Sequence, residues 1–171
     1  MILEIEEVTT NDTKVKDPVC GMIVDEHGIK TAYEENHYAF CSRQCLERFL
    51  ANPGIYIGQS GQKSLKQYGA EVIKCRRLRL AHSLSIEGRE IVRAELCSMM
   101  GVKSVEFDDA KLRIIYDLIQ VTAEQIEAKL GGIGVKLGAG WAERLRRAFA
   151  EFEEETEIAD LEIANKFHQA E

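Results

Sequence analysis

Short alternations of apolar and polar residues in the first third of the chain predict small strands and one helix. Residues 22–24 and 29–33 are expected to form a hairpin, with Gly28 supplying the positive φ of its turn. Residues 37–40 predict another strand, and Ser42 can cap a helix that ends near Asn52. The polar positions of this helix are assigned to its outer faces: Arg43, Gln44, Glu47 and Arg48.

A second series of patterns begins near residue 71 and alternates strand and helix periods. It predicts a strand at 78–86, a helix around 92–99, strands at 102–107 and 111–118, a helix at 123–130 and a strand at 135–137. Thr122 and Gln125 have the spacing of a capping box at the start of the helix predicted at 123–130. The order βαββαβ is that of a ferredoxin-like domain, and the fold class is therefore α+β.

A long helical pattern follows Gly140 and ends near His168. Its apolar stripe contains Trp141, Leu145, Ala148 and Phe152. Residues 139–171 hold nine acidic against four basic side chains, so full burial of this helix is not expected. Either its first half packs on the sheet, or the helix pairs with another chain.

The composition and these patterns together suggest several segments in the 171-residue chain. The expected segments are a flexible leader (1–16), a cysteine-rich domain (17–57), a linker (58–70), a ferredoxin-like domain (71–138) and an acidic helix (139–171). Hydrophobic residues make up 45% of the chain and its formal charge is -7. We expect no nucleic-acid surface, no membrane insertion and a cytoplasmic location.

Three of the five cysteines have an informative spacing. Cys41 and Cys45 lie four residues apart, so they share one face at the start of the predicted helix. The free amides and dipole at a helix start favour thiolate over thiol. Cys20 lies in a turn before a strand, and a hairpin can bring that turn to the helix start. The three sulfurs are therefore expected to converge on one point.

Thiolates are soft ligands, so the pattern predicts a site for Cu(I) first and Zn(II) next. Cu(I) accepts three ligands, whereas zinc usually requires a fourth. The sequence leaves four candidates for that ligand: Asp17, Met22, His27 and His37. No paired carboxylates, serine–histidine arrangement or nucleotide loop is present, and an enzymatic function is not expected.

Other residues of this chemistry have simpler interpretations. Cys75 and Cys97 are expected to be small buried hydrophobes, His82 a core histidine on a strand face, and Met99 and Met100 core filling at a helix end. The basic cluster at 74–79 is interpreted as the solvated face of a strand, and the acidic run 151–162 as a solvated helix face.

The segments DPVCGMIVDE and HYAFCSRQCLERFLANPGIYI resemble the YHS domain family, within the wider TRASH group of metal-binding modules. The resemblance covers residues 17–57. It implies metal ligation by Cys20, Cys41 and Cys45, in contexts of heavy-metal transport, chaperoning or sensing.

The stretch GVKSVEFDDAKLRIIYDLIQVTAEQIEAKLGGIGVKL, within residues 76–138, resembles a heavy-metal-associated (HMA) domain. The family's metal loop with its CxxC pair corresponds here to IEGREIVRAELC, which is shorter and lacks the pair. The resemblance therefore implies the fold, retained for docking or dimerisation, without a second cysteine site.

Two functions are consistent with the whole sequence. One is a soft-metal (copper-type) chaperone, trafficking or detoxification factor that passes its ion to a metal transporter or sensor protein. The other is a zinc-stabilised structural or interaction protein, whose HMA-like domain and long helix mediate homo-oligomerisation or partner docking.

Overall fold

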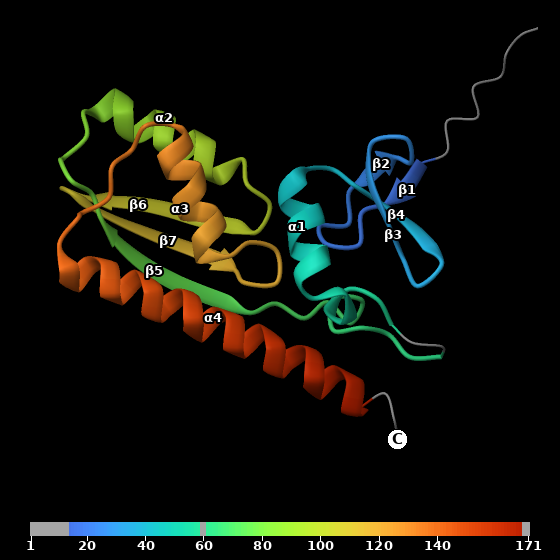
Figure 1. Ribbon diagram of the computed structural model, residues 1–171. Helices are drawn as coiled ribbons and strands as arrows, with labels where there is room; N and C mark the ends of the chain where they lie inside the picture. The colour runs from blue at the N-terminus through green and yellow to red at the C-terminus, as the bar shows by residue number, and fades with distance from the viewer. Residues whose placement is uncertain (1–13, 59–60, 169–171) are drawn as a thin grey trace, which may run out of the picture.

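The computed structural model describes residues 14–58 and 61–168 (Figure 1). Its N-terminal part contains two small antiparallel sheets and one helix. The elements are β1 (Lys14–Lys16), β2 (Ile23–Asp25), β3 (Ile29–Tyr33), β4 (Asn36–Phe40), α1 (Arg43–Ala51) and the 3₁₀ turn η1 (Pro53–Ile55). Ser42 caps α1 as predicted, because its side chain accepts a hydrogen bond from the amide of Cys45.

The strands of this part pair differently from the prediction. β2 pairs with β1, and β3 pairs with β4, so the expected hairpin of residues 22–24 with 29–33 is wrong. Gly28 does not adopt a positive φ; Glu34 and Glu35 do so instead, in the two-residue turn between β3 and β4. The predicted leader is also shorter, because residues 14–16 form β1, while residues 1–13 lie outside the described residues.

The second part has the predicted strand–helix order. Its elements are β5 (Ile73–Arg79), α2 (Ile86–Cys97), β6 (Val102–Asp108), β7 (Lys111–Asp117) and α3 (Ala123–Gly132). The sheet order is β5-β7-β6, and Leu137 makes an antiparallel bridge to Leu80 beside β5. This is the ferredoxin-like order with its last strand reduced to one bridge. The capping box of Thr122 and Gln125 is present as predicted.

The strand predicted at 78–86 is displaced. β5 ends at Arg79, and Ser85 caps α2 by accepting a hydrogen bond from the amide of Gly88. The alternation at 80–86 therefore belongs to a loop and a helix start. His82 lies in this loop and is exposed, so its prediction as a core histidine is wrong.

One hydrophobic core runs through both parts of the molecule. It includes Phe49 of α1, Tyr56, Leu112 of β7 and Ile126 of α3. The predicted linker contributes to it, because Leu65 packs against this core and Ser64 is fully buried. Cys75 and Cys97 lie outside the core and are exposed, which contradicts their prediction as buried hydrophobes.

The helix α4 (Trp141–His168) follows the β5 edge of the sheet and reaches the N-terminal part (Figure 1). Glu162 accepts a hydrogen bond from the amide of Gly54 at 3.1 Å, and Asn165 donates one to the carbonyl of Gly54 at 2.9 Å. Nearer its middle, Glu154 accepts a hydrogen bond from the amide of Ala123 at 2.8 Å. α4 is therefore bonded to both parts. Within the described ranges, no helix is both long and apolar enough to cross a membrane.

Candidate metal centre

Two loops and a helix start bring the three predicted cysteines together. Cys20 lies in the turn between β1 and β2, where the amide of Gly21 donates to the carbonyl of Asp17 and Gly21 adopts a φ of 81°. Cys41 directly follows β4, and Cys45 lies in the first turn of α1. The register of β3 with β4 fixes where Cys41 leaves the sheet.

The sulfur atoms converge as the sequence predicts. Cys41 Sγ lies 3.5 Å from Cys20 Sγ and 3.5 Å from Cys45 Sγ. Together with a carboxylate oxygen of Asp17, the three sulfurs lie within 4.8 Å of one another. Cys45 is fully buried, whereas Cys20 and Cys41 remain partly accessible. The Cys45 side of the cluster is therefore closed to solvent, and the side with Cys20 and Cys41 is accessible to it.

Of the four candidates for a fourth ligand, Asp17 is the one in this cluster. It is fully buried, and its Oδ1 accepts hydrogen bonds from the amides of Val19 at 2.8 Å and Cys20 at 3.3 Å. Its Oδ2 accepts one from the amide of Cys41 at 2.8 Å. These contacts also give Asp17 a positioning role, because they join the turn of Cys20 to the end of β4.

The two histidines line a different cavity. His27 and His37 lie around it with Glu26, Lys30 and Tyr38. Met22 lines a groove that also contains Cys41. Neither histidine belongs to the sulfur cluster.

The thiols of the cluster have different acidities. A hydrogen bond from Cys45 is the main cause that lowers the pKa of Cys20 to about 7. Burial raises the pKa of Cys41 to about 11. The hydrogen bond to Cys20 and burial raise the pKa of Cys45. These directions make Cys20 the acidic thiol of the metal-free cluster. They differ from the expectation that the helix start favours thiolates at Cys41 and Cys45, because burial acts against a charged sulfur at both positions.

The spacing of the sulfurs fits a metal ion. Zn–S bonds of about 2.3 Å at tetrahedral angles place neighbouring sulfurs about 3.8 Å apart. The two 3.5 Å separations differ from this value by only a few tenths of an ångström. Three sulfurs with a carboxylate oxygen suit Zn(II), and three sulfurs alone suit Cu(I). The cluster therefore supports binding of a soft metal ion, held by Asp17, Cys20, Cys41 and Cys45 or by the three sulfurs.

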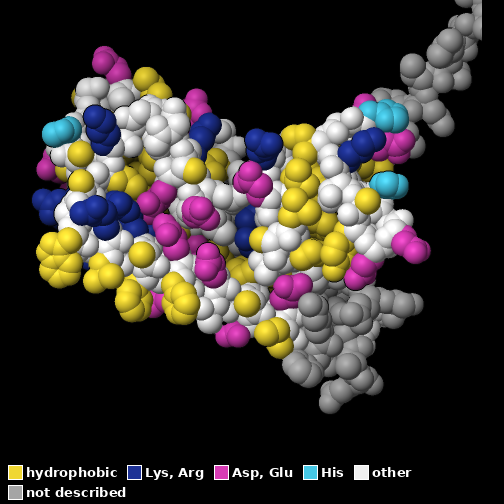
Figure 2. Space-filling view, viewed as in Figure 1, with side chains coloured by type: hydrophobic (Ala, Val, Ile, Leu, Met, Phe, Trp, Pro, Cys, Tyr) yellow, Lys and Arg dark blue, Asp and Glu magenta, His cyan; other side chains and the backbone are white. Residues whose placement is uncertain are grey.

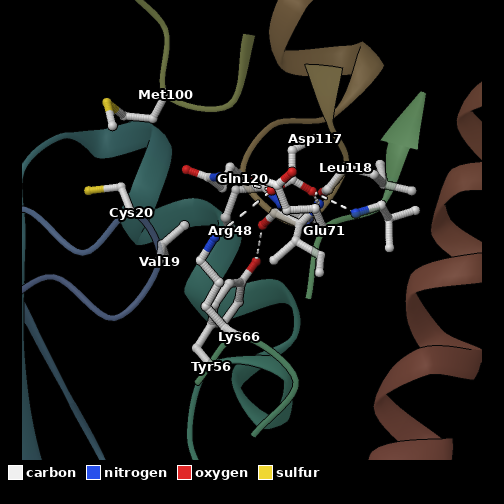
Figure 3. Close-up of polar contacts among 12 residues, drawn as sticks. Val19, Cys20, Arg48, Tyr56, Lys66, Glu71, Met100, Asp117, Leu118 and Gln120 are labelled. Carbon is white, nitrogen blue, oxygen red and sulfur yellow. Dashed lines mark hydrogen bonds and ion pairs between the residues drawn. The ribbon is translucent and has the colours of Figure 1, made fainter. Parts of the chain in front are cut away.

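The helix α1, which carries Cys45, and Tyr56 after it are anchored to the second part by polar contacts (Figure 3). Arg48 donates to the carbonyl of Leu118 at 3.3 Å, and Tyr56 donates to that of Ile119 at 2.6 Å. Gln44 donates to the carbonyl of Gln120 at 3.0 Å. The prediction that placed Gln44 and Arg48 on outer faces is wrong for Arg48, which is 5% exposed, because α1 packs on both sides.

Comparisons with known proteins agree with the first resemblance. Residues 15–60 match the YHS domain family, which confirms the likeness seen in the sequence. No curated protein matches the chain. Among solved structures, oxidised MerP from Ralstonia metallidurans CH34 is similar at 10% identity, over 39% of this chain and 96% of MerP, with a TM-score of 0.37.

Proposed function

We propose that the protein is a carrier of a soft metal ion of the Cu(I) type, and that it passes the ion to a metal transporter or sensor protein. The carrying observation is the convergence of three cysteine sulfurs and the buried Asp17 in a YHS domain. Cys20 and Cys41 are partly accessible, which suits transfer by exchange of ligands with another thiol site. Such a carrier would act in metal trafficking or detoxification, without catalysis.

The proposal places the protein in a reducing compartment, the cytoplasm. Metal binding needs free thiols, and all five cysteines are free in the described structure. An oxidised pair among the three would remove the site.

The test is a competition for Cu(I). Protein purified without added metal is analysed for metal content and then titrated anaerobically with Cu(I) against a chelator. Tight binding that displaces any zinc present supports a carrier. Stoichiometric zinc that Cu(I) cannot displace would overturn the carrier and favour a structural zinc site.

A second candidate function is self-association through α4. Four large apolar side chains lie exposed along one face of its first half, visible at the lower edge of Figure 2. They are Trp141 (75% exposed), Leu145 (52%), Phe149 (62%) and Phe152 (65%). The face that binds the rest of the molecule is a different one and includes Glu154 and Ile158.

The charges beside this apolar face favour a second copy of the same helix. Arg144 and Arg146 are exposed toward its start, and Glu153 and Glu155 are exposed toward its middle. An antiparallel pair with a twofold axis near Phe149 would place the arginines of each copy opposite the glutamates of the other. The apolar side chains would pack between them.

A further inference from the structure

A groove beside Cys41 is lined by every methionine in the described part of the chain. It has a volume of about 580 Å³ and lies between the turn after Cys20, the start of α1, the turn after α2, and α3. Arg43, Glu47 and Lys129 also line it. We call it the methionine groove and define it by Met22, Cys41, Met99 and Met100. Three thioethers and one thiol therefore border the same space.

Packing accounts for only part of this arrangement. Met99 and Met100 pack against the core with one side and line the groove with another, so their prediction as core filling is incomplete. Met22 is 48% exposed and adds little to the core. An exposed methionine across a groove from two others suits a ligand that binds thioethers.

The turn that carries Met99 and Met100 is held against the cysteine helix. Gln44, which lies between Cys41 and Cys45 in the sequence, donates a hydrogen bond to the carbonyl of Met100 at 2.7 Å. Gly101 follows with a φ of 92°, and a Cβ there would lie 2.6 Å from Cβ of Gln120. In Figure 3 the side chains of Met100 and Cys20 project to the same side of the view.

The three thioether sulfurs that line the groove favour a soft metal ion as its ligand. Thioether sulfur is soft, uncharged and needs no deprotonation, so it binds Cu(I) far better than Zn(II). Cys41 belongs to the groove and also lies 3.5 Å from the other two cysteine sulfurs. An ion on the methionines can therefore reach the cysteines by exchange of one sulfur ligand for another.

We propose that the methionine groove is a second, weaker Cu(I) site through which the three-cysteine site is loaded. This inference rests on the proposed function and adds a metal preference and an entry path. The groove is expected to fill after the cysteines and to leave Zn(II) binding unchanged.

The test uses protein labelled with ¹³C in the methionine methyl groups, which gives four signals because the sequence has four methionines. Cu(I) is added anaerobically to two equivalents. The second equivalent should shift the signals of Met22, Met99 and Met100 and leave that of Met1 in place. In a second sample whose cysteine site is already filled by one equivalent of Zn(II), a second equivalent of Zn(II) should shift none of them. Methionine signals that stay fixed through the second equivalent would overturn the inference.

Variants separate this inference from the proposed function. M22L/M99L/M100L should bind one Cu(I) instead of two, with the affinity of the first within about threefold of wild type, since leucine keeps the volume of methionine. Two equivalents of Cu(I) bound by this variant would overturn the inference of a second site in the groove. M22L alone changes an exposed position, so folding is preserved, and it should weaken the second site. A wild-type protein that fails to bind the first equivalent at its cysteines would instead overturn the carrier function.

Discussion

The amide of Cys41 donates a hydrogen bond of 2.8 Å to Oδ2 of Asp17, 24 residues earlier in the chain. Oδ1 of the same carboxylate accepts from the amides of Val19 and Cys20. One buried side chain thus sets the distance between two loops that each carry a cysteine. Asp17 holds the cluster together whether or not its oxygen also binds the ion.

Asp17→Asn is expected to lower metal affinity about 10–100-fold, the range typical of groups that orient metal ligands. An asparagine has one acceptor oxygen and an NH₂ group, which cannot accept from both sides of the turn. The measurement is competition for Cu(I) and for Zn(II). Asp25→Asn is the matched control, since Asp25 is exposed, lies outside the cluster and accepts from the amide of His27. Equal affinities for D17N and wild type would contradict this role.

Cys41→Ser and Cys45→Ser are each expected to lower Cu(I) affinity by more than about 100-fold. Removal of a metal ligand should lower the affinity more than removal of a group that only orients ligands. The matched controls are Cys75→Ser and Cys97→Ser, which change exposed cysteines outside the cluster. The readout is the chelator concentration that removes half of the Cu(I). Full affinity in both cluster variants would exclude the three-cysteine site.

The metal-free protein is expected to react with iodoacetamide first at Cys20. Its pKa of about 7 makes half of it thiolate near neutral pH, whereas the pKa of Cys41 is about 11. The rate at Cys20 should therefore rise through pH 7 and level off above it. Peptide mapping in a C75S/C97S background follows each site.

Cys45→Ala provides the check on the cause of that acidity. The hydrogen bond from Cys45 is the largest contribution that lowers the pKa of Cys20, so its removal should move the reactivity curve to higher pH. Bound metal should suppress the reaction at all pH values at which it stays bound. A curve at Cys20 that is unchanged by C45A would show that another group activates this thiol.

The chemistry of the site was more predictable from the sequence than its surroundings. The C-x3-C spacing and the Ser42 cap are local features, and they place Cys41 and Cys45 correctly. The packing of α1 is a tertiary feature: Arg48 looks like a surface residue until the loop at 118–121 covers it. The strand pairing is also a tertiary feature. Gly28 lies in a segment with the composition of a tight turn, but β2 pairs with β1, whose residues the sequence pattern assigns to a leader.

Tyr56→Phe is expected to destabilise the protein by about 1–3 kcal/mol, since it leaves the buried carbonyl of Ile119 without its 2.6 Å hydrogen bond. This bond joins the cysteine-bearing part to the loop that follows β7. Tyr68→Phe is the matched control, because Tyr68 is 72% exposed. Urea unfolding of the metal-free proteins measures both, and equal midpoints would show that the hydrogen bond of Tyr56 adds nothing to this interface.

The charge pattern of α4 leads to a prediction about geometry as well as association. L145E/F149E should convert a dimer to a monomer in light scattering after size-exclusion chromatography, because it places charges in the apolar face. Ile91→Glu is the matched control, at a position 61% exposed on α2.

Reversal of the two arginines in R144E/R146E should weaken the dimer by repulsion from Glu153 and Glu155 of the other copy. The combination with E153R/E155R should restore it, since an antiparallel pair exchanges the two groups. A parallel pair would bring like charges together in both reversed and unreversed proteins, so rescue by the quadruple variant supports the antiparallel arrangement. A wild-type protein that is monomeric at all concentrations would exclude self-association and leave the apolar face without this role.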